Sequence, residues 1–567
     1  MSEIFSVDLQ GIGPLRGAVD DALDRLEEES VPARIWARDH TLWSPDPDEI
    51  ENRLGWLDAP ESHPEPEDAA ERLRAAAVEK GVDRALLLGM GGSSLAPEVF
   101  ARIYGPVADG LELRVLDSTD PAAVRAMLDW AAPSRTLVVV ASKSGTTVET
   151  RSLFRTFWTR AAGELGPDAT GERFAAVTDP GTPLARLGER LGFQRVFRAT
   201  PDVGGRYSAL TWFGIAPATV VGADVDRLFE AARGTADACR ADDPRENPGA
   251  RLGAVLAAAA NGGRDKLTLV FSPTVEPFGA WIEQLIAEST GKSGRGILPV
   301  PTSGPEAPEA YGDDRLFAHV RLEGEDRHDE GIAALERAGH PVVRLPVGDR
   351  YDLGGHLFGW EFATAVAGHR MGIHPFDQPN VESAKKRASE RVESYRRSGS
   401  LEEPEPDIDA GEMSVWADFP ARDLAAAIDG LVDRAVEGGY VAIQAFVPST
   451  ATIDDRLRAL ADALRDRTGL AVTRGYGPRY LHSTGQLHKG DAGDGVFLML
   501  TASATEDVPI PDEPGSDDSS LSFGVLERAQ ALGDLRALRD AGRVVVRVDL
   551  GADPEEGLDR LVEAVGE

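Results

Sequence analysis

Two stretches of glycines and small hydroxyl residues directly follow apolar runs, at residues 86–97 (LLLGMGGSSLAP) and 136–150 (TLVVVASKSGTTVET). An apolar run that breaks into Gly and Ser is typical of a buried parallel strand that ends in a loop before a helix. The N-terminus of such a helix attracts anions, because its first N–H groups are unpaired and its dipole is positive there. The two stretches therefore predict an anion site at the carboxyl ends of two strands.

The side chains in these stretches suit a phosphate ligand. Hydroxyl groups surround one ammonium group within residues 142–147, without the spacing of a Walker-type loop. The alternative is that both stretches are ordinary strand-to-helix turns capped by Ser and Thr. We favour phosphate binding, because two such loops occur in one series of alternating strands and helices. The candidate binding residues are Gly92, Ser93, Ser142, Lys143, Ser144, Thr146 and Thr147.

A carboxylate stands near the end of an apolar helix. Phe278, Trp281, Leu285 and Ile286 have the spacing of one buried helix face, and Glu288 follows them. A carboxylate beside an apolar wall loses hydration, which raises its pKa toward the range of a general base. The alternative is a helix-terminal Glu in water.

These residues lie in motifs that resemble those of the glucose-6-phosphate isomerase family, which is built from sugar isomerase (SIS) domains. The family's phosphate loop, SK-[ST]-x-TT-x-ET, matches residues 142–150, and its E-S-x-G-K motif matches residues 288–292. The signature N-x-F-D-Q-x-G-V-E-x-x-K matches residues 374–385, with His374 in place of Asn and Asn380 in place of Gly. Because Gly is usual at that position, Asn380 is expected to need a left-handed backbone.

The resemblance implies a role for each matched residue. Glu288 is expected to be the catalytic base, Gln378 a phosphate contact and Lys385 a ring-opening group. A GGR[YF]S segment of the family matches Gly205 and Arg206, and its Arg faces the substrate carbons that exchange protons. A Gly-Gly turn with a solvated Arg is the alternative at this position.

The histidine that helps to open the sugar ring is missing from its usual place. In the family it follows the E-S-x-G-K motif, but here the matching L-H-S-x-G-Q segment is residues 481–486, after the signature motif. The motif order is permuted, so His482 can open the ring only if the C-terminal part of the chain folds over the catalytic base. A solvated surface loop is the alternative, and a metal site of His482 and His488 is less favoured because no carboxylate stands at ligand spacing. The next candidates for ring opening are His356 and His374.

Strands alternating with helices of 10 to 15 residues indicate doubly wound parallel sheets. We therefore predict an α/β fold with two SIS-type doubly wound parallel-sheet domains and a smaller C-terminal α/β unit. The expected division is an N-terminal helical segment (1–70), a first SIS domain with the phosphate loop (71–220), a second SIS domain with Glu288 and the FDQ motif (221–396), an acidic linker (397–412) and the C-terminal unit (413–567).

The composition is that of an acidic chain. Among 567 residues, 60 are Lys or Arg and 95 are Asp or Glu, which gives a net charge of −35 and argues against nucleic-acid and anionic-membrane partners. Such a charge suits either high salt or an ordinary acidic protein. The absence of a long apolar run, the lack of a signal-like start and the single Cys239 lead us to expect a cytoplasmic protein.

Lysine is rare in this chain, since only seven of the basic residues are Lys. A retained Lys among many Arg residues suggests a role for a compact, titratable ammonium group. Four of the seven lie in the motifs described above or directly after them, namely Lys143, Lys292, Lys385 and Lys489.

The resemblance implies an aldose-ketose isomerase that interconverts glucose 6-phosphate and fructose 6-phosphate through a cis-enediolate, without metal or organic cofactor, as a homodimer. The layout is also similar to the isomerase half of bifunctional transaldolase/glucose-6-phosphate isomerase proteins, although we expect no transaldolase activity because no transaldolase barrel precedes it. Two alternatives stay open. One is a SIS-type regulator that binds a sugar phosphate without turnover, and the other is a broader phosphoglucose/phosphomannose isomerase.

Overall fold

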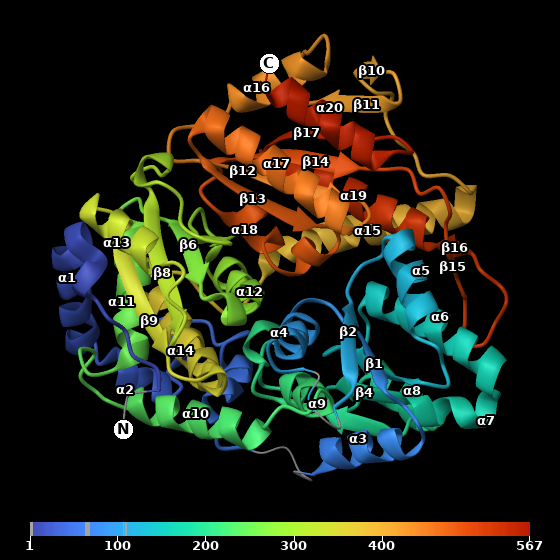
Figure 1. Cartoon of the computed structure of the whole chain (residues 1–567), viewed down its shortest axis with the longest axis horizontal. Helices are drawn as coiled ribbons and strands as arrows, with labels where there is room; N and C mark the ends of the chain where they lie inside the picture. The colour runs from blue at the N-terminus through green and yellow to red at the C-terminus, as the bar shows by residue number, and fades with distance from the viewer. Residues whose placement is uncertain (1–3, 63–67, 106, 108–109, 567) are drawn as a thin grey trace.

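The computed structural model describes residues 4–62, 68–105, 107 and 110–566. Within these described residues, three main sheets, each covered by helices, surround a common centre, and a two-stranded sheet accompanies them (Figure 1). This architecture confirms the predicted α/β fold class, in which two parallel sheets are joined by a third, C-terminal α/β unit.

The first sheet is parallel and has the strand order β2-β1-β3-β4-β5. Its central strands β1 and β3 are apolar and almost completely buried, as expected for a sheet covered on both faces. The order reverses between β1 and β3, so the loops that follow these two strands open side by side at the point where α/β sheets bind ligands. The strands are β1 (Arg84–Leu88), β2 (Glu112–Leu116), β3 (Thr136–Ala141), β4 (Phe174–Thr178) and β5 (Arg195–Arg198); the helices are α4 (Leu95–Tyr104), α5 (Pro121–Trp130), α6 (Val148–Leu165), α7 (Pro167–Thr170), α8 (Pro183–Arg190) and α9 (Trp212–Val220).

The second sheet is also parallel, in the order β7-β6-β8-β9. Its first strand leads through a short turn into α12, whose apolar face is buried and whose last turn carries Glu288. The strands are β6 (Lys266–Phe271), β7 (Leu298–Thr302), β8 (Arg315–Leu322) and β9 (Val342–Val347); the helices are α10 (Val225–Ala238), α11 (Pro248–Asn261), α12 (Phe278–Thr290), α13 (Asp329–Arg337) and α14 (Leu353–Met371).

The third sheet repeats this order with four parallel strands, β13-β12-β14-β17, and extends it with the antiparallel strands β11 and β10. Strand β10 lies within the segment that we expected to be a linker. The strands are β10 (Ile408–Ala410), β11 (Met413–Ala417), β12 (Tyr440–Phe446), β13 (Ala471–Tyr476), β14 (Gly495–Thr501) and β17 (Val544–Asp549), with a small hairpin of β15 (Pro509–Ile510) and β16 (Leu521–Ser522); the helices are α16 (Leu424–Val432), α17 (Ala451–Thr468), α18 (Gly485–Gly490), α19 (Phe523–Asp540) and α20 (Pro554–Gly566).

The N-terminal segment forms the helices α1 (Arg16–Glu28) and α2 (Val31–Trp36) and several short turns, and α3 (Ala69–Glu79) leads into β1. It packs on both parallel-sheet units: α1 lies beside α11 of the second (Figure 1), and Leu54 forms a bridge with Val203 of the first. The ring of Trp36 stacks on Phe358 at 5.9 Å between centroids, and Trp43 Nε1 donates to the carbonyl of Ala365 at 2.9 Å.

Helix α15 (Pro379–Ser398) joins the second unit to the third and packs along α19 (Figure 1). Its N-terminus carries the FDQ-type signature, and its body lies against the C-terminal unit. The proposed boundary at residue 396 therefore falls inside this helix, and the division of the chain into independent domains stays a prediction.

Candidate active site

A cavity of about 1090 Å³ lies where all three sheet units meet. All the predicted site residues except Ser142 line it, and they come from the loops after β1 and β3, from α12, from α15 and from the C-terminal unit. The lining includes the predicted residues Gly92, Ser93, Lys143, Ser144, Thr146, Thr147, Gly205, Arg206, Glu288, Gln378, Lys385 and His482. Segments far apart in the sequence are thus brought to one site within one chain.

The loop after β3 is organised by its own hydroxyl groups. Ser142 Oγ accepts the Gly145 N–H at 3.1 Å and lies 3.0 Å from Thr147 Oγ1, so it supports the loop from behind. Ser144 Oγ lies 2.8 Å from Thr146 Oγ1. Thr147 is the N-cap of α6, but its side chain does not cap the helix, which leaves the first-turn N–H groups of α6 directed at the loop. This arrangement suits an anion.

The ammonium of Lys143 is held by an acid beside the loop. Lys143 Nζ forms an ion pair with Asp179 at 2.7 Å and donates to the carbonyl of Pro201 at 3.1 Å. Burial lowers the pKa of Lys143, and the charge of Asp179 opposes this shift. Lys143 lines the cavity, but its charge is already partly neutralised there.

The loop after β1 packs so closely against residues 204–206 and 481–483 that two of its positions require glycine. A Cβ on Gly92 would lie 2.0 Å from the carbonyl oxygen of Gly205. Gly91 has φ +55°, and a Cβ there would lie 3.1 Å from the Cβ of His482. The close packing of the GGSS loop against residues 204–206 and against the L-H-S segment explains these glycines.

The Glu288 carboxylate is buried in a polar setting rather than against an apolar wall. Arg206 Nη1 lies 3.3 Å from Glu288 Oε1, and Gln284 Nε2 donates to Glu288 Oε2 at 3.0 Å. Arg206 itself donates through Nε to Ser289 Oγ at 2.8 Å. Its Nη2 donates to the carbonyls of residues 375 and 377 at 2.7 and 3.0 Å. Arg206 is therefore a rigid, buried guanidinium whose Nη1 faces the Glu288 carboxylate.

Lys292 has a structural role in this site. Lys292 Nζ donates to the carbonyl oxygen of Asp377 at 2.6 Å and to the Oδ1 of the same residue at 2.7 Å. Burial, together with the nearby charge of Arg206, lowers the pKa of Lys292 to about 8, and Asp377 opposes this shift. Lys292 and Arg206 together fasten the FDQ segment to the end of α12.

Asn380 does not adopt the left-handed conformation that we expected. It is the second residue of α15, where a right-handed helical backbone suits any side chain, and it is absent from the described residues with positive φ. Its Oδ1 instead accepts from Gln486 Nε2 at 2.7 Å. An Asn in place of the family's Gly thus provides a contact to the L-H-S-x-G-Q segment.

Gln486 joins the two motifs that carry the other candidate residues. Its Oε1 accepts the N–H groups of Asn380, at 2.9 Å, and Val381, at 3.3 Å, which belong to the first turn of α15. Its Nε2 donates to the carbonyl of Gly291 at 2.9 Å. Gln486 is fully buried. The C-terminal unit is therefore an integral part of the site.

His482 lies at the end of the short turn η11 (Arg479–His482) and lines the cavity. Its carbonyl accepts from Gln284 Nε2 at 2.8 Å, so the amide that contacts Glu288 also contacts His482. Its ring Nε2 lies 3.1 Å from Glu149 Oε1. Burial disfavours the Glu149 carboxylate, yet the charge and hydrogen bond of His482 hold its pKa below the usual value.

The other two candidate histidines lie outside the lining of this cavity. His356 is buried against Phe5 and contacts the carbonyl of Pro346 at 3.2 Å, and burial lowers its pKa to about 4. His374 contacts the carbonyl of Asp48 at 3.3 Å. Within the described residues, His482 is the only histidine in the cavity lining.

Sequence reasoning missed three residues of this site. Glu149 belongs to the matched SKSGTTVET segment, so that motif could have suggested it. Gln284 precedes Glu288 by one helical turn, which places both on one face of α12. Gln530, on α19, donates to Glu149 Oε1 at 2.7 Å, and no motif in the sequence points to it.

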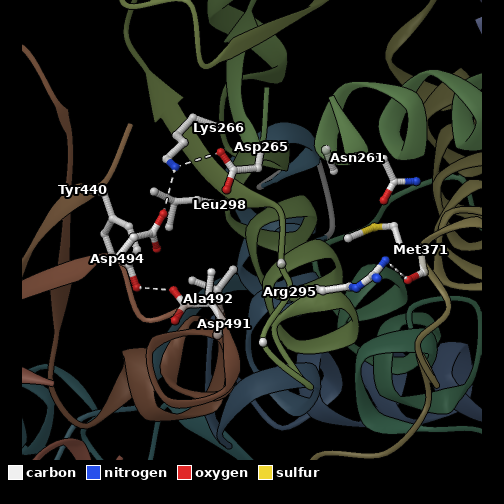
Figure 2. A pocket seen from close by; sticks show the side chains of 14 residues that line it. Asn261, Asp265, Lys266, Arg295, Leu298, Met371, Tyr440, Asp491, Ala492 and Asp494 are labelled. Carbon is white, nitrogen blue, oxygen red and sulfur yellow. Dashed lines mark hydrogen bonds and ion pairs between the residues drawn. The ribbon is translucent and has the colours of Figure 1, made fainter. Parts of the chain in front are cut away.

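A second cavity, of about 290 Å³, lies between the second unit and the C-terminal unit (Figure 2). Its charged side chains already have partners within the protein, and Arg295 donates to the carbonyl of Met371 at 2.6 Å. Lys266 Nζ pairs with Asp265 at 2.7 Å and Asp494 at 3.4 Å, and Tyr440 donates to Asp491 at 2.7 Å. We therefore assign no ligand to this cavity.

Neither a metal cluster nor a membrane span is found in the described part of the chain. Among residues 4–62, 68–105, 107 and 110–566, His, Cys, Asp and Glu side chains form no group of three or more that could hold a metal ion. Over the same ranges, the helices are too short or too polar to cross a membrane.

Comparison with known proteins gives a consistent result. Residues 68–296 match the family model of phosphoglucose isomerase. The chain is 31% identical over 424 residues to a glucose-6-phosphate isomerase from Rubrobacter xylanophilus, which covers 65% of this chain and 94% of the relative. It is 27% identical over 382 residues to one from Enterococcus faecalis, with 59% and 85% covered.

Solved structures share the fold. A hypothetical protein from Thermus thermophilus superimposes with a TM-score of 0.60 at 25% identity, covering 68% of this chain and 99% of its own. A glucose-6-phosphate isomerase from Chlamydia trachomatis gives 0.55 at 18% identity, with 66% and 86% covered, and at that identity it supports the fold alone. The relative from Rubrobacter xylanophilus, matched over nearly its whole length, establishes the family: this chain belongs to the phosphoglucose isomerase family.

Proposed function

We propose that this enzyme interconverts glucose 6-phosphate and fructose 6-phosphate through a cis-enediolate, with Glu288 as the general base. The observation that carries the proposal is the shared cavity: Glu288 and His482 both line it, next to the hydroxyl-rich loop, and Gln284 contacts both of them. The names of the curated relatives support the same substrate pair.

The phosphate group of the substrate binds at the loop after β3. The hydroxyls of Ser144, Thr146 and Thr147 and the first-turn N–H groups of α6 act as donors to its oxygens. Ser93, from the loop after β1, and Gln378 complete the set. Ser142 acts indirectly, because it holds the loop rather than facing the cavity.

Ring opening is assigned to His482 together with Lys385, which lines the same cavity. Opening moves a proton from the C1 hydroxyl to the ring oxygen, so the site needs a group that both accepts and donates a proton. Imidazole suits this exchange near neutral pH. Glu149 contacts Nε2 of His482, which leaves Nδ1 to meet the sugar.

Isomerisation follows on the open chain. Glu288 removes the proton from C2 of the aldose, the electron pair of the C–H bond forms the C1–C2 double bond, and O1 gains negative charge. A proton then moves from O2 to O1, the electron pair of the O2–H bond forms the C2 carbonyl, and the electron pair of the C1–C2 double bond takes the proton from Glu288 at C1, which gives the ketose. Arg206 Nη1, fixed beside Glu288, stabilises the enediolate as its charge develops.

The test compares turnover of glucose 6-phosphate and mannose 6-phosphate by the purified chain. Turnover of glucose 6-phosphate alone supports the proposed specificity, and turnover of both supports the broader phosphoglucose/phosphomannose isomerase. Saturable binding without turnover of either sugar contradicts the proposal and favours the regulator.

Two further expectations are part of the proposal. The homodimer is expected from the resemblance because family sites are completed across subunits, but here His482 reaches the cavity within its own chain. A dimer is therefore not required to supply this histidine, and sedimentation of the native protein tests whether one forms. The cytoplasmic location also stays an expectation.

A further inference from the structure

A chain of three hydrogen bonds runs from the first sheet unit into the C-terminal unit and ends on the candidate ring-opening histidine. Thr119 Oγ1 donates to Gln530 Oε1 at 2.7 Å, and Gln530 Nε2 donates to Glu149 Oε1 at 2.7 Å. The same Glu149 oxygen lies 3.1 Å from His482 Nε2. Thr119, Gln530 and Glu149 are each less than 5% exposed, so water does not compete strongly for these contacts.

The carboxylate of Glu149 selects the neutral tautomer of His482 that can contact it. The nitrogen end of the Gln530 amide faces Glu149, and its oxygen end accepts from the Thr119 hydroxyl. A carboxylate only accepts hydrogen bonds, so Glu149 takes one N–H from Gln530 and one from His482. In the neutral ring the proton is therefore on Nε2, which leaves Nδ1 as the acceptor.

Gln530 is a polar side chain at a buried position of α19. It lies on α19 between the buried residues Ala529 and Ala531 and lines the cavity. A buried amide destabilises a protein unless both of its ends are paired, and an apolar side chain would fill this place more easily. Here both ends are paired, and the partner at the nitrogen end is the acid that contacts His482.

We infer that Gln530, supplied by the C-terminal unit, is a positioning residue for ring opening: it orients Glu149 and so holds His482 in the tautomer that acts on the sugar. This inference rests on the proposed function. It also gives the C-terminal unit a second contribution to the reaction besides His482. Gln530 acts through Glu149 and His482 and is not assigned a contact with the sugar.

The test is a double-mutant cycle on kcat/KM for glucose 6-phosphate. Gln530→Met removes both hydrogen bonds of the amide while keeping a side chain of nearly the same length. Because one of these bonds is to a charged group, its loss should lower kcat/KM by about 10–100-fold. In a His482→Ala background the same change should lower kcat/KM less than about twofold, because the group that Gln530 positions is gone. Equal losses in both backgrounds would overturn the inference, since a merely structural role would weaken both proteins alike.

Gln444→Met is the matched control. Gln444 is also a buried Gln of the C-terminal unit, on β12, and it contacts His488 Nδ1 at 3.2 Å away from the cavity lining. Gln444→Met should leave kcat/KM unchanged in each background, relative to the wild type in one and to His482→Ala in the other. If Gln530→Met does not fold, Thr119→Val tests the inference instead, because it removes the hydroxyl that donates to the Gln530 amide without altering α19. The inference then predicts a lower kcat/KM, and an unchanged kcat/KM would contradict it. An inactive wild type would refute the proposed function rather than this inference.

Discussion

Replacing Gln486 by Met should loosen the contact between the C-terminal unit and the two motifs that it joins. The side chain is fully buried and bonds to Gly291, Asn380 and Val381. Met keeps the length and the apolar stem but offers no partner for these groups. The change therefore isolates the hydrogen bonds from the packing.

The magnitude follows from the groups left without partners. The Gly291 carbonyl and the Val381 N–H are both in buried residues. A buried donor or acceptor without a partner costs about 1–3 kcal/mol, so two such groups should destabilise this contact by about 2–6 kcal/mol. Because 1.36 kcal/mol corresponds to a factor of ten, local opening should become at least about 30-fold more frequent.

Hydrogen exchange measures this opening directly. Peptides that cover residues 378–390 and 485–492 should exchange at least about 30-fold faster in the variant. Peptides from α17 (Ala451–Thr468), on another side of the same unit, should keep their rates and serve as the internal control. Unchanged exchange at 378–390 would refute this role of Gln486, and equal acceleration in α17 would mean that the whole unit unfolds instead.

Three other predictions address the phosphate loop, the half-buried acid Glu283 and the acidic surface. Thr147→Val removes one hydroxyl that donates to the charged phosphate, so binding of glucose 6-phosphate should weaken about tenfold or more. An equal loss for a non-phosphorylated analogue would contradict phosphate binding at this loop. Burial raises the pKa of Glu283 to about 7 from 4.5, with Arg479 and Ser483 opposing; its stabilisation is complete below pH 4.5 and is lost as the pH rises through about 7. The melting temperature of wild type relative to Glu283→Gln should therefore fall between pH 5 and pH 8, and a constant difference would count against this. Raising monovalent salt from about 0.1 M to about 1 M shortens the Debye length from about 10 Å to about 3 Å. If salt adaptation explains the surface, a chain of charge −35 should therefore melt at a higher temperature in the higher salt. A flat or falling melting temperature would favour an ordinary acidic composition.

Local patterns predicted much of the fold and of the candidate site. The apolar runs before residues 91 and 142 became the central strands of the first sheet, and the helix before Glu288 buries its apolar face as expected. These predictions held because strand burial and helix periodicity depend on near neighbours in the chain. The parallel order then brought the two loops together at one edge of the sheet.

The contacts between distant segments could not be predicted in this way. His482 and Glu149 are 333 residues apart, and Gln530 and Glu149 are 381 apart. Their meeting depends on how the third sheet unit packs on the other two, which no local pattern encodes. This packing also explains why a permuted motif can still reach the cavity.

The lysines illustrate a second limit of sequence reasoning. A rare Lys in a motif suggested a titratable group, but Lys292 fastens the FDQ segment through Asp377. Lys489 is buried, pairs with Asp534 at 2.6 Å and donates to the carbonyl of Gly485 at 3.0 Å, so it holds α18 to α19. The motif marked the right segment of the chain in both cases, and only the three-dimensional contacts revealed the role.

The most direct test of the account follows a proton during turnover of fructose 6-phosphate in D₂O, with wild type and with Glu288→Gln. If Glu288 carries the proton, part of it should exchange with solvent, and the glucose 6-phosphate formed should contain deuterium at C2. The variant cannot accept the proton, so its turnover should fall at least about 10²-fold while it still binds a sugar-phosphate inhibitor. Turnover without any deuterium at C2, or near-normal turnover by Glu288→Gln, would contradict the assignment of Glu288 as the base.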